Sequence, residues 1–296
     1  MKVIGTGITG LVGSRIVELN PSVEFVNVSI ESGISILDLA ELETVFAANP
    51  DADTVLHLAA FTDTNGAWTQ NGDKAGLCYQ LNVVGTQNLV NLCKKYNKYL
   101  IYISTDFVFD GKKEGKYTED DVVSPIEWYG ATKAMGEDVV GKSGISASIV
   151  RLAFPYRANF DAKKDIVRKI IDGFKAGKLY PQWTDHFTTP TFIDDIAQAL
   201  GIFFDKKPTG IYHLVGSSSQ SPYEMCLQIA DVFGFDKSIV EQSTLSDYVK
   251  SLPEGSRPWQ YNLSLDNTKI KSLGITPKTL REGLEEMKKQ MGENNE

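Results

Sequence analysis

Residues 3–17 read VIGTGITGLVGSRIV, and this stretch decides the fold. A short apolar strand runs directly into three glycines with the spacing GxxGxxG, namely Gly7, Gly10 and Gly13, and a helix is expected over residues 14–17. Glycine permits a tight turn and lets the backbone approach a pyrophosphate closely, while the start of the helix offers free N–H groups. Because the triplet lies between a first strand and a first helix, it predicts a dinucleotide-binding turn.

The rest of the first half alternates short strands with helical periodicity. Strands are expected at residues 3–4, 23–28, 54–58, 99–103 and 148–150. Helix starts are marked by Asp38 with Glu41, and by Ser-Pro-x-Glu runs beginning at Ser124 and Ser221. This βαβα order predicts an α/β fold, a Rossmann-type doubly wound parallel sheet whose ligand crevice lies beyond the carboxyl ends of the strands.

The second half has a different predicted organisation, with helices separated by longer loops that contain proline and aromatic residues. A chain of 296 residues is long enough for one large domain or two modest ones, at roughly 100–200 residues per domain. We therefore expect an NAD(P)-binding Rossmann domain over 1–152 and a smaller substrate-binding lobe over 153–296, partly interleaved with the first.

Composition excludes several classes of protein. Lys and Arg total 30 against 38 Asp and Glu, a net charge of −8, which argues against a nucleic-acid binder because such proteins need a basic face. No apolar run approaches the roughly 18 residues of a membrane span, and the chain enters its first strand at Lys2, with no room for a signal peptide. We expect a cytoplasmic protein that binds neither nucleic acid nor membrane.

Cysteine and histidine are sparse. Cys78, Cys93 and Cys226 lie far apart without a CxxC pair, and the chain has only three histidines, so no metal site is expected. Cys93 shares a helical face with Leu89 and Leu92, which indicates a core thiol in a reducing compartment.

The type of nicotinamide cofactor depends on the end of the second strand. An acidic residue there would bind the ribose 2′-hydroxyl of NAD, whereas a basic one would favour the 2′-phosphate of NADP. The strand ends in Val28-Ser29-Ile30-Glu31, with Glu31 near the expected interval and no Lys or Arg close by. The sequence thus accommodates NAD(H) or NADP(H) and slightly favours NAD(H).

A proton-transfer group is predicted where Tyr129 and Lys133 form the pattern YxxxK. The two residues are one helical turn apart, and an ammonium group at that distance should lower the phenol pKa from about 10 towards the working range. The fourth strand ends in Ser104-Thr105-Asp106, at the edge where ligands bind, so a hydroxyl there can hydrogen-bond a substrate carbonyl. The ordered combination is far more specific than YxxxK alone.

Together these motifs resemble the extended short-chain dehydrogenase/reductase family. The resemblance lies in TGITGLVG (6–13), HLAA (57–60), NVVGTQNL (82–89), STDFVFDG (104–111) and YGATKAMGE (129–137). Within that family, STDFVFDG followed by YGATKAMGE is similar to the dTDP-4-dehydrorhamnose reductase branch. So are Arg257-Pro258, LDNTK (265–269) and LGI (273–275), and the likeness extends to about residue 290.

The resemblance implies reduction of a 4-keto sugar on a nucleotide diphosphate, as in dTDP-rhamnose biosynthesis, by a cytoplasmic enzyme and suggests a homodimer. It assigns roles residue by residue. Thr105 would polarise the ketone, Tyr129 would be the acid, Lys133 would lower its pKa, and Asp106 and Phe154 would contact the sugar. The cofactor would lie along Gly7, Gly10, Leu11, Val12, Gly13, Asp38, Leu39, Ala59, Ala60, Phe61, Tyr129 and Lys133, with Asn82 as a structural or cofactor-side residue.

Some residues depart from the branch. Residues 62–68 read TDTNGAW instead of the usual sequence, Phe154 replaces a tryptophan, and HLAA with NVVGTQNL is more similar to epimerases and dehydratases. Two alternatives therefore stay open. One is a sugar-nucleotide epimerase or dehydratase, and the other is a non-catalytic cofactor-binding subunit resembling the regulatory subunit of methionine adenosyltransferase, since a fold alone does not fix function.

Overall fold

The computed structural model describes residues 1–293, which form two compact units. Unit 1 comprises residues 1–110, 122–151 and 197–212, and unit 2 comprises 111–121, 152–196 and the described residues from 213 onward. The assignment of cofactor to 1–152 and substrate to 153–296 stays a prediction, and residues 294–296 of that range lie outside the described part.

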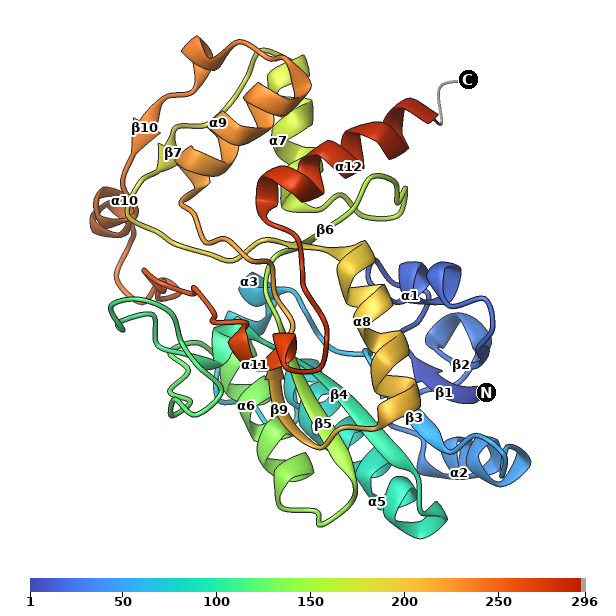
Figure 1. Cartoon of the computed structure of the whole chain (residues 1–296). Helices are drawn as coiled ribbons and strands as arrows, with labels where there is room; N and C mark the ends of the chain where they lie inside the picture. The colour runs from blue at the N-terminus through green and yellow to red at the C-terminus, as the bar shows by residue number, and fades with distance from the viewer. Residues whose placement is uncertain (294–296) are drawn as a thin grey trace. The chain divides into compact units, whose positions relative to one another are not determined.

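Unit 1 is built on an open sheet that, within residues 1–293, has six strands in the order β2-β1-β3-β4-β5-β9 (Figure 1). β1 pairs in parallel with β2 and with β3, and β3 pairs in parallel with β4. The predicted Rossmann-type fold is confirmed. The chain passes from β1 to β2 on one side of β1 and then crosses back to β3 on its other side. The loops that follow β1 and β3 therefore meet at the reversal of strand order, where such folds bind ligands. The strands are β1 (Lys2–Thr6), β2 (Glu24–Val28), β3 (Thr54–His57), β4 (Tyr99–Thr105), β5 (Ala147–Leu152) and β9 (Gly210–His213).

Helices and tight turns connect these strands. They are α1 (Gly13–Leu19), η1 (Ile30–Ser32), α2 (Leu39–Ala48), α3 (Thr64–Trp68), α4 (Leu77–Tyr79), the π-helical η2 (Gln80–Gly85), α5 (Thr86–Tyr96), η3 (Asp106–Val108) and α6 (Trp128–Gly141). α8 (Ile193–Lys206) starts in unit 2 and ends in unit 1. As predicted, Asp38 caps α2: its Oδ1 accepts from the backbone N–H groups of Ala40 and Glu41, each at 3.0 Å.

The predicted helix start at Ser124 is wrong. α6 begins at Trp128, and its cap is Glu127, whose carboxylate accepts from the backbone N–H groups of Tyr129 and Gly130. The backbone N–H of Ser124 instead donates to the carbonyl of Val108 at 2.9 Å, outside the helix. The reason is that Glu127 satisfies the free donors of the first turn itself, so no residue further upstream is needed as a cap.

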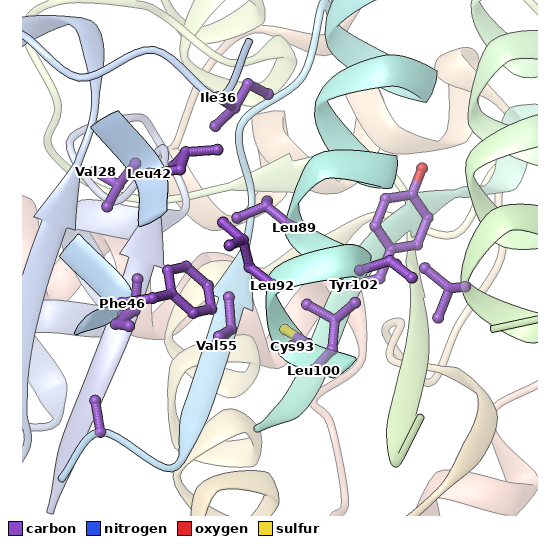
Figure 2. Close-up of a cluster of buried hydrophobic side chains, with 14 of the residues drawn as sticks. Val28, Ile36, Leu42, Phe46, Val55, Leu89, Leu92, Cys93, Leu100 and Tyr102 are labelled. Carbon is purple, nitrogen blue, oxygen red and sulfur yellow. The ribbon is translucent and has the colours of Figure 1, made fainter. Parts of the chain in front are cut away.

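A cluster of buried apolar side chains holds α2 and α5 against the strands (Figure 2). Phe46 and Leu42 of α2, Leu89 and Leu92 of α5, and Val55 of β3 are all 2% exposed or less. Burying one such side chain stabilises the fold by roughly 1.5–3 kcal/mol. Cys93 lies in the same cluster at 1% exposure, so the predicted core thiol is confirmed, and Cys78 and Cys226 are buried as well.

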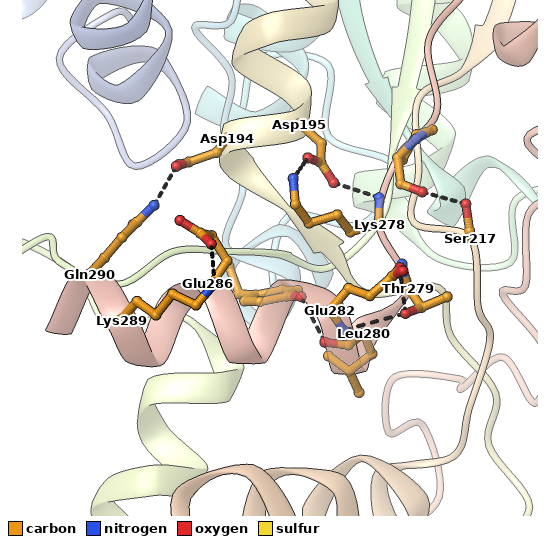
Figure 3. Close-up of polar contacts among 12 residues, drawn as sticks. Asp194, Asp195, Ser217, Lys278, Thr279, Leu280, Glu282, Glu286, Lys289 and Gln290 are labelled. Atoms are coloured by element: carbon orange, nitrogen blue, oxygen red, sulfur yellow. Dashed lines mark hydrogen bonds and ion pairs between the residues drawn. The ribbon is translucent and has the colours of Figure 1, made fainter. Parts of the chain in front are cut away.

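Unit 2 combines two small parallel strand pairs with helices. Its elements are β6 (Pro155–Tyr156) with β8 (Thr191–Phe192), β7 (Gln182–Trp183) with β10 (Gln242–Ser243), α7 (Ile166–Lys175), α9 (Pro222–Phe233), η4 (Lys237–Ile239), α10 (Leu245–Ser251), α11 (Thr268–Lys271) and α12 (Leu280–Glu293). The predicted capping box of Ser221 and Glu224 opens α9. Polar contacts anchor α12 and the residues before it (Figure 3): Gln290 donates to Asp194 at 2.7 Å, and Lys278 pairs with Asp195 at 2.6 Å.

Candidate active site

The glycine turn after β1 is shaped by close backbone approach. Gly7 has a φ of +65°, and a Cβ there would lie 2.7 Å from the backbone nitrogen of Ala59. A Cβ at Gly13 would lie 2.5 Å from the Cα of Ile8. Gly10 is different, because a Cβ there would meet only the carbonyl oxygen of Gly7, at 3.3 Å, and the residue is exposed. Gly7 and Gly13 thus shape the turn, while Gly10 leaves its outer surface open, which fits the approach of a pyrophosphate.

Glu31 lies over this turn. It belongs to η1, just after β2, and its Oε2 accepts a hydrogen bond from the hydroxyl of Thr9 at 3.2 Å. The backbone N–H of Glu31 and the hydroxyls of Ser29 and Thr9 hold the pKa of its carboxyl below the ordinary value. An ionised carboxylate therefore stands beside the glycine turn. The preceding residue, Ile30, is 81% exposed and Leu39, the first residue of α2, is 42% exposed, a large exposure for apolar side chains.

The segment that follows β3 is fixed by Asn82 of η2. The Asn82 carboxamide accepts from the backbone N–H of Phe61 at 2.8 Å and donates to the carbonyl of Phe61 at 3.2 Å. It also donates to the hydroxyl of Thr132 in α6 at 2.9 Å. Asn82 thereby ties the segment of Ala59, Ala60 and Phe61 to the helix that carries Tyr129. This positioning function agrees with a structural role for Asn82.

His57, at the end of β3, serves the fold. Its Nδ1 is 2.7 Å from the hydroxyl of Thr6 and its Nε2 is 3.1 Å from the hydroxyl of Thr86. Complete burial lowers the imidazole pKa to about 3, with Lys133 adding in the same direction. The ring is therefore neutral at any physiological pH and cannot act as a proton donor.

Unit 1 brings together the predicted proton-transfer residues. Thr105 is the last residue of β4 and caps η3, and its hydroxyl lies close enough to the hydroxyl of Tyr129 in α6 to act on the phenol pKa. Lys133, one turn further along α6, donates from Nζ to the carbonyl oxygen of Ile103 in β4 at 2.7 Å. Its Nζ also lies 4.2 Å from the centre of the Tyr102 ring. Two hydroxyls and an amine from two elements thus converge at the carboxyl end of β4.

The electrostatics of these residues differ from the sequence-based expectation. The pKa of Tyr129 is raised, not lowered, because burial dominates and Asp106 and Glu127 add to it. Burial also lowers the pKa of the Lys133 amine to about 7, so this amine exerts less positive charge than expected. Tyr129 therefore keeps its proton, which suits a residue that donates a proton better than one that accepts it.

Two buried carboxyl groups adjoin Tyr129, and sequence reasoning assigned a chemical role to only one of them. Asp106 accepts from the Thr105 hydroxyl through Oδ1 at 2.8 Å and is 1% exposed. Glu127 is 2% exposed and holds the backbone N–H of Tyr129 at 2.9 Å. In the sequence, the feature that could have pointed to Glu127 is its position as a charged residue immediately before the aromatic pair Trp128-Tyr129.

Phe154 belongs to unit 2, whereas the site residues described so far belong to unit 1. It is one of the few residues other than glycine with positive φ within residues 1–293, at 42°. Its ring makes an edge contact with His186, with centroids 6.3 Å apart. Such strain in a bulky residue persists only where surrounding contacts enforce it, and it is common at ligand-binding positions. The contact between Phe154 and the sugar stays a prediction.

Within the described residues, no group of three or more His, Cys, Asp or Glu side chains is arranged to hold a metal ion. Searching the same part of the chain finds no helix with the length and hydropathy of a membrane span.

Comparison with known proteins now gives the family. The family model described as the RmlD substrate binding domain matches residues 1–293. The chain belongs to this family. The resemblance to extended short-chain dehydrogenase/reductases and their dTDP-4-dehydrorhamnose reductase branch is thereby confirmed.

Individual relatives of the RmlD family give finer comparisons. A probable low-salt glycan biosynthesis reductase, Agl14 of Haloferax volcanii, is 30% identical over 237 residues, or 79% of this chain and 76% of that protein. A solved dTDP-4-dehydrorhamnose reductase of Clostridium acetobutylicum has a TM-score of 0.87 at 26% identity, covering 99% of this chain and 100% of that one. The prediction of an NAD(P)-dependent oxidoreductase is confirmed at the level of this family.

A third relative has a different name. The methionine adenosyltransferase 2 subunit beta of Mus musculus is 32% identical over 216 residues, or 70% of this chain. The chain spans only 62% of that subunit's length. The chain is therefore similar both to named reductases and to a named subunit of another enzyme.

Proposed function

We propose that the chain reduces the 4-keto group of a sugar carried on a nucleotide diphosphate, with NAD(P)H as the reductant. The observation that carries the proposal is the proximity of the Thr105 and Tyr129 hydroxyls in one buried group, with a lysine one helical turn from the tyrosine. The likeness to two named reductases supports the same reaction.

The cofactor would be held by residues of unit 1. Gly7, Gly10, Leu11, Val12 and Gly13 would take the pyrophosphate, Asp38 and Leu39 would lie near the adenine, and Ala59, Ala60 and Phe61 would line its path. The ionised Glu31 beside the glycine turn favours a free ribose 2′-hydroxyl over a 2′-phosphate, so we propose NAD(H) as the preferred form. When bound, the nicotinamide supplies a hydride.

The chain's own residues handle the proton. Thr105 donates a hydrogen bond to the ketone oxygen, which polarises the carbonyl. Tyr129, whose raised pKa keeps it protonated, gives its proton to the oxygen that gains negative charge. Lys133 holds the ribose of the cofactor through Nζ. Asp106 lies at the sugar side of this group.

A direct test measures NADH and NADPH oxidation by the purified chain with a panel of dTDP- and UDP-linked 4-keto sugars, with identification of the product sugar. Tyr129→Phe keeps the ring but removes the proton, so turnover should fall by on the order of 10²–10⁴ while cofactor affinity persists. Thr105→Val should weaken turnover, and Thr105→Ser should restore much of it. Unchanged turnover in Tyr129→Phe would show that another group is the acid.

A second candidate is a cofactor-binding subunit without turnover, which the 32% identity to the mouse subunit favours. Under this alternative the purified chain would bind NAD(H) or NADP(H) but oxidise neither with any keto sugar in the panel. It would also bind a methionine adenosyltransferase catalytic subunit and alter its rate. Conversion of a sugar without net cofactor oxidation would instead indicate an epimerase or a dehydratase.

A further inference from the structure

Asp106 has the geometry of a carboxylic acid that keeps its proton. One carboxyl oxygen, Oδ1, accepts the Thr105 hydroxyl at 2.8 Å. The other, Oδ2, is buried and has no hydrogen-bond partner among residues 1–293. A buried anionic oxygen without a donor is costly, whereas the O–H of an acid can sit there and donate to a neighbour.

The charged and titratable groups that face Asp106 come from several elements. The Glu127 carboxylate, at the start of α6, adds negative charge, and Tyr129 and Lys133 follow on the same helix. Cys78 of α4 lies against Tyr129. Burial raises the pKa of Asp106 to about 7, and Glu127 acts in the same direction, while the Thr105 hydroxyl and nearby backbone N–H groups oppose it.

The Lys133 amine does little to oppose the rise in the pKa of Asp106. Its Nζ is directed to the carbonyl of Ile103, and its own pKa is lowered to about 7. Asp106 and Glu127 are two carboxyl groups in one buried neighbourhood, and both oxygens of Glu127 already accept from backbone N–H donors, which favours the anion there. The proton therefore goes to Asp106, the carboxyl with the unpartnered oxygen.

A hydroxyl group donates only one hydrogen bond, so the state of Asp106 decides what Thr105 can do. When Asp106 is ionised, Thr105 donates to it and can only accept from other groups. When Asp106 is protonated, it can donate to Thr105, whose own proton is then free to turn towards a ketone oxygen. Protonation of Asp106 thus reverses the direction of the hydrogen bond between its carboxyl group and the Thr105 hydroxyl.

We propose that Asp106 is a positioning residue that works in its acid form and directs the Thr105 hydroxyl towards the substrate ketone. This role rests on the proposed function, since it requires a ketone to reduce. Asp106 loses no proton during the reaction. The proton that ends on the product comes from Tyr129.

The first measurement needs no turnover. Carbon-13 NMR of the protein labelled at aspartate carboxyls should show one carboxyl that titrates near pH 7, absent in Asp106→Asn. If Asp106→Asn fails to fold, Thr105→Val identifies the same signal, because loss of the hydrogen bond to Oδ1 should raise its pKa further. Glu127→Gln should lower it. An Asp106 carboxyl that titrates in the ordinary range near 4 overturns the proposal.

The second measurement is the pH profile of reduction. In the wild type, kcat/KM should be level at low pH and fall about tenfold per pH unit above the pKa of Asp106. Asp106→Asn donates at every pH, so this falling limb should disappear from whatever activity the variant keeps. The exposed Asp138→Asn, on the outer face of α6, should keep the wild-type profile. A falling limb that survives in Asp106→Asn overturns the proposal. A wild type without any turnover overturns the proposed function instead. The NMR titration separates these two failures, because it reports on the Asp106 carboxyl without any turnover.

Discussion

Replacing Lys133 with methionine should make the protein more stable while abolishing its activity. The Lys133 side chain is 3% exposed, and burial lowers its pKa from 10.5 to about 7. At about 1.4 kcal/mol per tenfold change, holding a charged amine there costs on the order of 4 kcal/mol at pH 7. Methionine has a similar volume and removes this cost. It leaves the Ile103 carbonyl without its lysine donor, a loss of roughly 1–3 kcal/mol. The net gain is on the order of 2 kcal/mol.

The sign of the pH dependence follows from the lowered pKa. Below pH 7 the amine is charged in both the folded and unfolded protein, so the wild type bears the full burial cost. Between pH 7 and 10.5 only the unfolded protein keeps the proton, and the cost fades as pH rises. The advantage of Lys133→Met should therefore be largest at pH 6.5 and shrink or reverse at pH 9.5.

Urea denaturation at these two pH values, followed by fluorescence, measures the difference directly. Lys142→Met is the matched control, because Lys142 sits at the end of the same helix with a 76% exposed side chain and should change stability by less than about 0.5 kcal/mol. Lys133→Met should also lose cofactor affinity and turnover. A variant less stable than wild type at pH 6.5, or a difference that does not change with pH, would refute the reasoning.

Three further changes test other parts of unit 1. Gly10→Val should fold and lose dinucleotide affinity in isothermal titration, since its Cβ meets only the Gly7 carbonyl, whereas Gly13→Val should express as unfolded protein by circular dichroism. Glu31→Arg should shift the ratio of NADPH to NADH affinity about tenfold or more towards NADPH, or roughly 1.4 kcal/mol, and no shift would show that Glu31 does not face the ribose. Glu137→Gln should cost about 3–5 kcal/mol in urea denaturation, because it removes the negative charge and one of the two acceptor oxygens that the carboxylate offers to the buried Arg151 guanidinium.

Local sequence pattern was enough to predict the glycine turn and five strands of the sheet, whereas β9 was not predicted. The GxxGxxG run follows β1 and ends at the first residue of α1, and the cap of α2 at Asp38 is where the D-x-x-E pattern places it. Both features depend on contacts within a few residues. The predicted helix start at Ser124 was wrong because it, too, was judged from local sequence alone. Residues 124–127 read as a good capping box, but in the structure the carboxylate of Glu127 caps the first turn of α6.

The charge states of the site could not be predicted from sequence. The spacing of Tyr129 and Lys133 implies a charged amine beside the phenol, and in water that amine would lower the phenol pKa. Burial reverses the expectation, since it favours the neutral form of both groups, raising one pKa and lowering the other. Burial comes from side chains far away in sequence, such as Phe61 and Cys78, which pack around Tyr129.

The close packing of η3 on α6 connects these observations. A Cβ at Gly130 would overlap the carbonyl oxygen of Phe107, so glycine after Tyr129 lets the first turn of α6 lie directly against η3. That approach brings Asp106, Thr105 and Tyr129 together in one buried group, in which the Thr105 hydroxyl donates to Asp106. Gly130 therefore supports the chemistry by its small size. A larger residue at this position would push η3 away from α6 and separate the Thr105 and Tyr129 hydroxyls. It would also admit solvent, which would return the pKa of Asp106 to its ordinary value.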